Sequence, residues 1–138
     1  MKVDKYYVPD NLLYTKDHEW VNMAEKEAVV GVSQYASEML HDIVFVTLPS
    51  IGSVVEAKKA IASIESVKSV SDVFNPIDGI ITSINAELAQ HPELINQDPY
   101  GKGWLYGIKP ASELVDRAVL MGASEYIKII EEELSQQG

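Results

Sequence analysis

Two copies of a short turn-and-strand pattern constrain the fold of this chain more than any other feature. Residues 49–55 and 76–82 both read Pro, two residues, Gly, one residue and then two strand-forming residues. Proline and glycine favour a turn that leads into a strand. The repeat predicts a β-domain built from two similar halves related by a pseudo-twofold axis. The segment midway between the two glycines, around Glu65 and Ser66, should then lie at one extremity of the molecule.

The segment between the two copies predicts a β-hairpin. Apolar residues recur at every third position from Ile61 to Val73, which fits neither a long helix nor one alternating strand. A hairpin explains this spacing, because inward-facing positions change phase across a turn. No Asn-Gly or Asp-Gly pair marks the tip, and we expect the turn over residues 65–69. A turn places Lys68 in solvent.

The rest of the chain predicts further strands and a few helices. Strands are expected over 14–15, 19–21, 28–32, 43–48 and 104–108, and a helix should begin after Ser33. Residues 85–96 predict a short helix and a loop, with Pro92 at a first helical position. Two C-terminal helices should follow Ser112 and Ser124, the first of them ending at Gly122.

Composition excludes several classes of function. The 138 residues fit one domain. Eleven Lys and Arg against 21 Asp and Glu give a net charge of −10, which argues against nucleic acid and anionic membranes as partners. The absence of cysteine excludes disulfides, thiolate metal sites and cysteine nucleophiles. No apolar run approaches the roughly 18 residues of a membrane span, and from the first residues we expect no targeting signal. We expect a cytoplasmic monomer.

Lys68 is the main candidate for a functional residue. It could be an ordinary surface lysine, because exposure is the norm for this residue type. Alternatively, it could be a covalent attachment point, which needs an exposed tip, small neighbours and charged handles for a modifying enzyme. The small neighbours are Ser66, Val67, Ser69 and Ser71, and the charged handles are Glu65 and Asp72. Residue types alone do not decide between the two interpretations.

Four segments resemble, in order, the H-protein family of the glycine cleavage system. They are YTKDHEWV (14–21), DIVFVTLP (42–49), ESVKSVSDV (65–73) and PELINQDPYGKGWL (92–105). The resemblance runs from about residue 14 to residue 130. It implies a mainly β fold, a lipoyl-domain-like flattened β-barrel or sandwich with added α-helices and a C-terminal helical segment. We expect one carrier domain over 1–138, with its core at about 14–110 and its C-terminal helices at about 112–135.

The resemblance also implies a function, that of a carrier with no catalytic site of its own. Lipoate would be attached to Lys68 by a lipoyl ligase or lipoyl transferase, which would recognise Glu65, Ser66, Val67 and Asp72. In this family the arm receives an aminomethyl group from glycine decarboxylase (P protein) and passes it to aminomethyltransferase (T protein). Dihydrolipoamide dehydrogenase (L protein) then reoxidises the arm. The cofactor does the chemistry, and the protein positions it.

Glu19 is the second candidate. It could be no more than a charged residue that begins a strand. The functional hypothesis is that the loaded arm, which bears a cationic amine, folds back into a surface cleft and is held there partly by Glu19. A carboxylate beside an ammonium group favours the charged form of both groups.

The three histidines receive no functional assignment. His18, His41 and His91 lack the paired spacing of a metal site, and no metal is expected. His41 stands where the family usually has a glycine. It should therefore adopt the left-handed helical conformation at some cost, or form a differently shaped turn near the cleft.

Three other functions compete with glycine cleavage. The chain could be a lipoyl carrier of another pathway, such as sulfur oxidation with heterodisulfide-reductase-like proteins, or a donor in lipoate transfer. It could be a stand-alone enzyme that uses Glu65, Asp72 and Glu19 as acid–base carboxylates, although no metal constellation or deep apolar pocket is evident. It could also be a purely structural interaction domain whose Lys68 is never modified.

Overall fold

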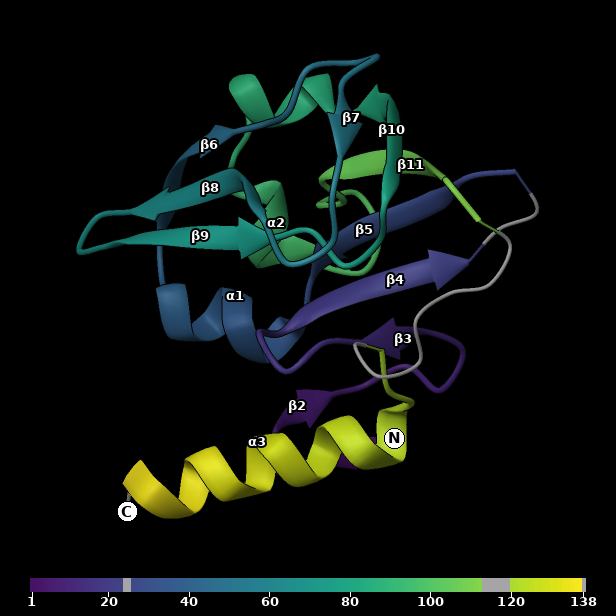
Figure 1. Ribbon diagram of the computed structural model, residues 1–138. Coiled ribbons are helices and arrows are strands. Elements are labelled where there is room, and N and C mark those ends of the chain that lie inside the picture. The colour runs from purple at the N-terminus through teal and green to yellow at the C-terminus, as the bar shows by residue number, and fades with distance from the viewer. Residues whose placement is uncertain (24–25, 113–119, 138) are drawn as a thin grey trace.

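The computed structural model describes residues 1–23, 26–112 and 120–137 of the chain (Figure 1). The elements in chain order are β1 (Lys2–Val3), β2 (Tyr6–Tyr7), β3 (Leu13–Tyr14), β4 (Glu19–Met23), β5 (Ala28–Val32), α1 (Gln34–Leu40), β6 (Ile43–Thr47), β7 (Val54–Val55), β8 (Ala60–Ser66), β9 (Val70–Phe74), β10 (Gly79–Ile84), the 3₁₀ helix η1 (Ala86–Ala89), α2 (Leu94–Gln97), β11 (Tyr106–Pro110) and α3 (Ala123–Gln137).

Two antiparallel sheets share one hydrophobic core. In the described part of the chain the larger sheet has the strand order β3-β4-β5-β11-β10-β7, and the smaller has the order β6-β8-β9. Side chains from both sheets, among them Val30, Ile64, Val73 and Ile108, form a single buried cluster. The mainly β sandwich with added helices is thereby confirmed.

The two copies of the Pro-x-x-Gly pattern lie side by side. Gly79 pairs with Val55, and Ile80 with Val54, in an antiparallel register. The backbone N–H of Ile81 donates to the Ser53 carbonyl at 3.0 Å across the same pairing. Glycine is required at position 79, because a Cβ there would clash with the carbonyl oxygen of Lys109. The two copies of the pattern therefore form neighbouring strands of the larger sheet.

The hairpin β8–β9 lies between these two copies in the sequence, and Figure 1 shows its tip projecting beyond the larger sheet. Strand β8 ends at Ser66 and β9 begins at Val70, so the turn predicted over 65–69 is confirmed, but it covers residues 67–69 and is two residues shorter at the start. The backbone N–H of Ser66 donates to the Ser69 carbonyl at 2.8 Å, and that of Val67 donates to the Asp42 carbonyl at 3.1 Å. The turn is thus fixed both to itself and to the segment that leads into β6.

A second, aromatic core fastens the C-terminal helix to the larger sheet. The rings of Tyr14 and Tyr126 stack with centroids 4.6 Å apart, and those of Tyr6 and Tyr35 meet edge to face at 5.0 Å. Both Tyr14 and Tyr126 are fully buried. Helix α3, the last predicted helix, therefore packs through its Tyr126 face, beside the β1–β2 ribbon.

Three sequence predictions need adjustment. The short helix expected at the start of residues 85–96 is the 3₁₀ helix η1, and the loop expected after it contains a second short helix, α2. Pro92, expected at a first helical position, lies two residues before α2, and without an N–H it cannot extend η1. The strand expected at 104–108 begins two residues later, since the Leu105 N–H donates to Val30 outside the β10–β11 ladder. The helix expected after Ser112 falls mostly on residues 113–119, outside the described residues.

Candidate functional site

Lys68 lies in solvent at the tip of the β8–β9 turn. No described residue forms an ion pair with its amine. The turn is shaped by Ser66, which is 5% exposed, and whose hydroxyl accepts a hydrogen bond from the Ser69 N–H at 3.2 Å. The buried Ser66 side chain thus stabilises the turn. The Lys68 amine, which the turn places in solvent, forms no ion pair with the described residues.

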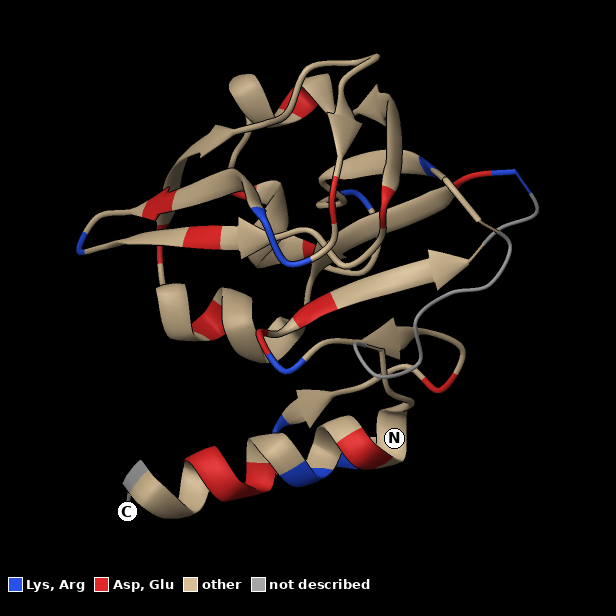
Figure 2. Cartoon of the chain, in the orientation of Figure 1, with Lys and Arg blue, Asp and Glu red and all other residues tan. Residues whose placement is uncertain are grey.

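The two expected charged handles lie on one face of the hairpin. Glu65 pairs with Val70, and Asp72 with Ser63, which puts both carboxyl groups on the outward face, where both are exposed. Figure 2 shows acidic ribbon on both strands and the basic tip beyond them. Val67, beside the lysine, is 71% exposed. Of the expected recognition residues only Ser66 is turned inward, so its contribution is to the shape of the turn.

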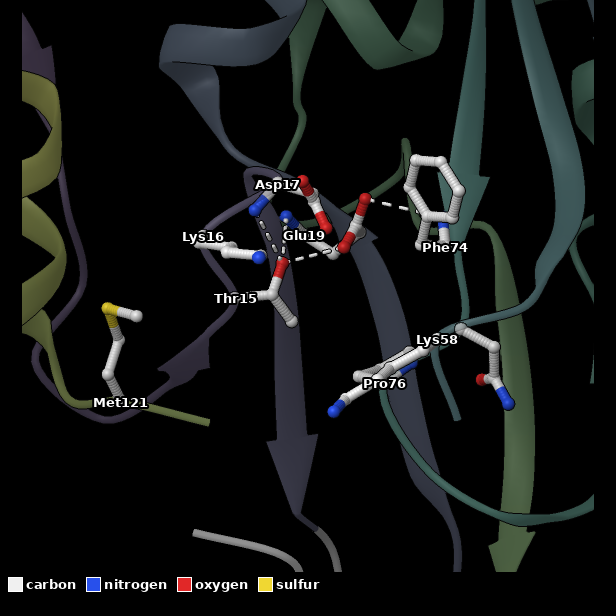
Figure 3. Close-up of a pocket in the computed structure, with 9 residues that line it drawn as sticks. Thr15, Lys16, Asp17, Glu19, Lys58, Phe74, Pro76 and Met121 are labelled. Atoms are coloured by element: carbon white, nitrogen blue, oxygen red, sulfur yellow. Dashed lines mark hydrogen bonds between the residues drawn. The ribbon is translucent and has the colours of Figure 1, made fainter. Parts of the chain in front are cut away.

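Glu19 lies apart from the tip, at the start of β4, and is 2% exposed. The Thr15 hydroxyl donates to its Oε1 at 2.6 Å, and the Phe74 N–H donates to its Oε2 at 3.4 Å. The Thr15 Oγ1 also accepts from the backbone N–H of Glu19 and of Asp17, each at 3.2 Å. One threonine therefore holds both ends of a tight turn and fixes the carboxyl group inside it (Figure 3).

Burial raises the pKa of Glu19 to about 8, with Asp17 adding to the rise, while the hydrogen bonds from Thr15 and Phe74 act in the opposite direction. No described lysine or histidine lies within ion-pair distance of the Glu19 carboxyl group. At neutral pH the group is therefore mostly protonated. Its buried proton is retained because no positive partner stabilises the carboxylate form.

The Glu19 carboxyl group opens onto a surface cavity of about 410 Å³. The β4 side, the base of β9 and the β7–β8 turn all contribute to its wall, as Figure 3 shows. The lining residues are Thr15, Lys16, Asp17, Glu19, Lys58, Phe74, Asn75, Pro76 and Met121. Strand β9 thus connects the two candidate regions, since it begins just after Lys68 and ends at Phe74 in the cavity wall.

His41 takes the second of its two expected conformations. Its φ of 61° is positive, but its ψ of −142° lies far from the left-handed helix. The Asn96 side chain donates to the His41 carbonyl at 2.6 Å and accepts from the Ile43 N–H at 3.2 Å, which stabilises this turn. His41 is absent from the described lining of the Glu19 cavity. It instead borders, with Val67 and Lys68, a smaller hollow of about 230 Å³ at the tip.

His18 is a structural residue that sequence reasoning left unassigned. Its Nδ1 lies 2.8 Å from the Tyr126 hydroxyl, and its Nε2 lies 2.8 Å from Glu133 Oε2. The Tyr126 hydroxyl lies 2.6 Å from that of Ser33, the N-cap of α1. These contacts join residues that are more than 90 positions apart, so no local sequence pattern predicts them.

Two further observations bear on the class of protein. Within the described ranges, no group of three or more His, Cys, Asp or Glu side chains is arranged to hold a metal ion. Over the same ranges, no helix combines the length and apolar character needed to cross a bilayer.

Sequence reasoning also missed Lys58, which enters the cavity from a turn more than 35 residues away from Glu19.

Comparison with known proteins identifies one family. The family model described as "Glycine cleavage H-protein" matches residues 12–133. Proteins named glycine cleavage system H protein are similar over nearly their whole length. That of Halothermothrix orenii is 47% identical over 127 residues, covering 91% of this chain and 97% of the relative. That of Thermus thermophilus is 42% identical over 126 residues, covering 91% and 98%.

A solved structure shows the same fold. The crystal structure of a glycine cleavage system H protein from Mycobacterium marinum superposes with a TM-score of 0.81 and 38% sequence identity. The match covers 88% of this chain and 97% of the other. The sequence and the three-dimensional arrangement thus agree on one family.

Proposed function

Because this chain belongs to the glycine cleavage H-protein family, we propose that it is a single-domain lipoyl carrier with no catalytic activity of its own. Lipoate is attached in amide linkage to Lys68, and the protein presents the arm to partner enzymes. The observation that carries this proposal is the position of Lys68, whose exposed amine has no ion-pair partner among the described residues and stands on a turn that other residues hold.

The surroundings of Lys68 fit such an attachment. Acylation removes the charge of the amine, and no described ion-pair partner is left behind when it does. We assign Glu65, Asp72 and Val67 to contact with the lipoyl ligase or transferase, since all three are exposed beside the tip. Ser66 acts indirectly by fixing the turn. A tethered arm then meets each enzyme at a local rather than a bulk concentration.

Lipoate on Lys68 would supply the dithiol chemistry of the carrier, which would let the protein carry the aminomethyl group of glycine from P protein to T protein and be reoxidised by L protein. The chain's own contribution is the Glu19 cavity. A cationic amine that enters the cavity gains a charge-assisted hydrogen bond to the carboxyl group, and in turn favours the carboxylate form. The Thr15 hydroxyl and the Phe74 N–H hold the two oxygens in position for this contact.

Reconstitution tests the proposal. Protein lipoylated in vitro by a lipoyl ligase is combined with P, T and L proteins, glycine, tetrahydrofolate and NAD, and glycine-dependent NADH formation is measured. We expect activity from the wild type and from Lys59→Arg, and none from Lys68→Arg. A lipoylated wild type that gives no NADH, while the Thermus thermophilus H protein does so in the same mixture, would instead assign the carrier to another lipoyl pathway.

A further inference from the structure

Lys58 occupies an unfavourable backbone conformation at the edge of the Glu19 cavity. Its φ is 72°, in the left-handed region that side chains with a Cβ avoid. The other described non-glycine residues with positive φ are Asp4, His18 and His41, residue types that are enriched in this region. Lysine has no short polar group to offset the strain locally. Such an outlier raises the question of what its side chain does.

The conformation of Lys58 is imposed by the turn between β7 and β8. The Lys58 N–H donates to the Asn75 carbonyl at 2.6 Å. The Asn75 side chain, which is buried, donates to the Glu56 carbonyl at 3.1 Å, and Asp78 accepts from the Ala57 N–H at 2.7 Å. Glycine would satisfy the same backbone hydrogen bonds without strain. The lysine at this position therefore adds one thing, a cationic side chain that lines the cavity.

The cavity is not anionic, although the protein as a whole is. Lys16 and Lys58 line it, together with Asp17 and Glu19. Because burial raises the pKa of Glu19 to about 8, its carboxyl group is mostly neutral at pH 7. Two cations then face one anion, on a chain whose net charge is −10. Such a cavity receives a further cation less readily than one lined by the carboxyl groups alone.

We propose that Lys58 is a specificity-determining residue of this cavity, whose ammonium group opposes the cationic amine of the loaded arm and so shortens the arm's stay. This inference rests on the proposed function, since it needs a lipoyl arm on Lys68 that enters the cavity. An uncharged arm feels no such repulsion. Lys58 therefore speeds release of the loaded arm and leaves release of the empty arm unchanged, whereas Glu19 slows release of the loaded arm.

The lifetime of the loaded arm tests this directly. Lipoylated protein is loaded with P protein and isotopically labelled glycine, P protein is removed, and loss of the label is followed as water releases the one-carbon unit as formaldehyde and ammonia. Lys58→Met removes the charge and keeps the side-chain length, and Lys58→Arg keeps the charge. Lys59→Met is the matched control, because Lys59 is an exposed neighbour outside the described lining of the cavity.

We expect Lys58→Met to lengthen the lifetime about two- to fivefold, the effect of one charge several ångströms away at an opening to water. Lys58→Arg and Lys59→Met should match the wild type. In 1 M salt the lifetime of the loaded arm in Lys58→Met should equal that in the wild type, because charges are screened. Lys58→Gly should show the same longer lifetime together with a higher Tm, because it also removes the backbone strain.

An independent readout is the Phe74 amide resonance in ¹⁵N-labelled protein, since this N–H donates to Glu19. On loading, it should shift further in Lys58→Met than in the wild type. Equal lifetimes and shifts for Lys58→Met and Lys59→Met, with a shorter lifetime for Glu19→Gln, would overturn the role of Lys58 and leave the carrier function standing. Failure to load the wild type at all would remove both.

Discussion

The buried carboxyl group of Glu19 should make the stability of the unloaded protein depend on pH. Its folded-state pKa of about 8 lies above the ordinary value of 4.5. Between these two values the folded chain retains a proton that the unfolded chain releases. The free energy of unfolding therefore falls as pH rises through this window, and stays low once the folded-state pKa has been passed.

The expected loss is large enough to measure. A pKa that is raised from 4.5 to about 8 corresponds to a decrease of about 4 kcal/mol in the free energy of unfolding between pH 5 and pH 9. Glu19→Gln keeps the size and the hydrogen-bonding capacity of the side chain but cannot ionise. As the pH rises from 5 to 9, the free energy of unfolding of the wild type should therefore fall by about this amount relative to that of Glu19→Gln.

Urea denaturation followed by tryptophan fluorescence, at pH values from 5 to 9, provides the assay. Glu65→Gln removes the same charge from an exposed position of the smaller sheet and controls for net charge. Parallel pH profiles for the wild type and Glu19→Gln would refute the reasoning, because they would mean that the Glu19 carboxyl group ionises in the fold as easily as in the unfolded chain.

Three further substitutions, one of them a control, test the packing of the fold. Gly31→Ala should destabilise the fold by about 1–3 kcal/mol, because a Cβ would lie 2.5 Å from the ring of Trp20. The control Gly122→Ala should be close to neutral in the same denaturation experiment, because nothing lies within 4 Å of a Cβ at that position. Equal effects of the two substitutions would contradict this account. Asn75→Ala should cost about 2–4 kcal/mol, because the buried amide donates to two backbone carbonyls and accepts from the Tyr106 hydroxyl; a loss below about 1 kcal/mol in chemical denaturation would show that water replaces these bonds.

The hairpin and its tip could be predicted from the sequence because their determinants are local. Proline and glycine at fixed spacing announce the two turns, and the midpoint between them locates the tip. In contrast, the recurrence of an apolar residue at every third position did not show which of these side chains are buried and which face solvent. Ile64 and Val73 are buried, whereas Val67 and Val70 are 71% and 64% exposed. The turn interrupts the alternation of the strands, and no pattern states which side of it faces water.

The candidate cavity could be predicted only in part. Glu19 was found through its motif, but its burial depends on Thr15 and on the Phe74 backbone 55 residues away. Lys58 was not found, because its position in the cavity follows from a positive φ and from hydrogen bonds to Asn75. Contacts between distant segments leave no periodic trace in a single sequence.

The most direct test of the carrier function is the mass of the protein made in cells that synthesise lipoate. Intact-mass measurement, followed by fragmentation of the peptide that contains residue 68, should show one lipoyl increment, and should locate it on Lys68. The increment should be absent from Lys68→Arg and present in Lys59→Arg. An unmodified chain in lipoate-replete cells, or a lipoyl group on any other lysine, would contradict the account.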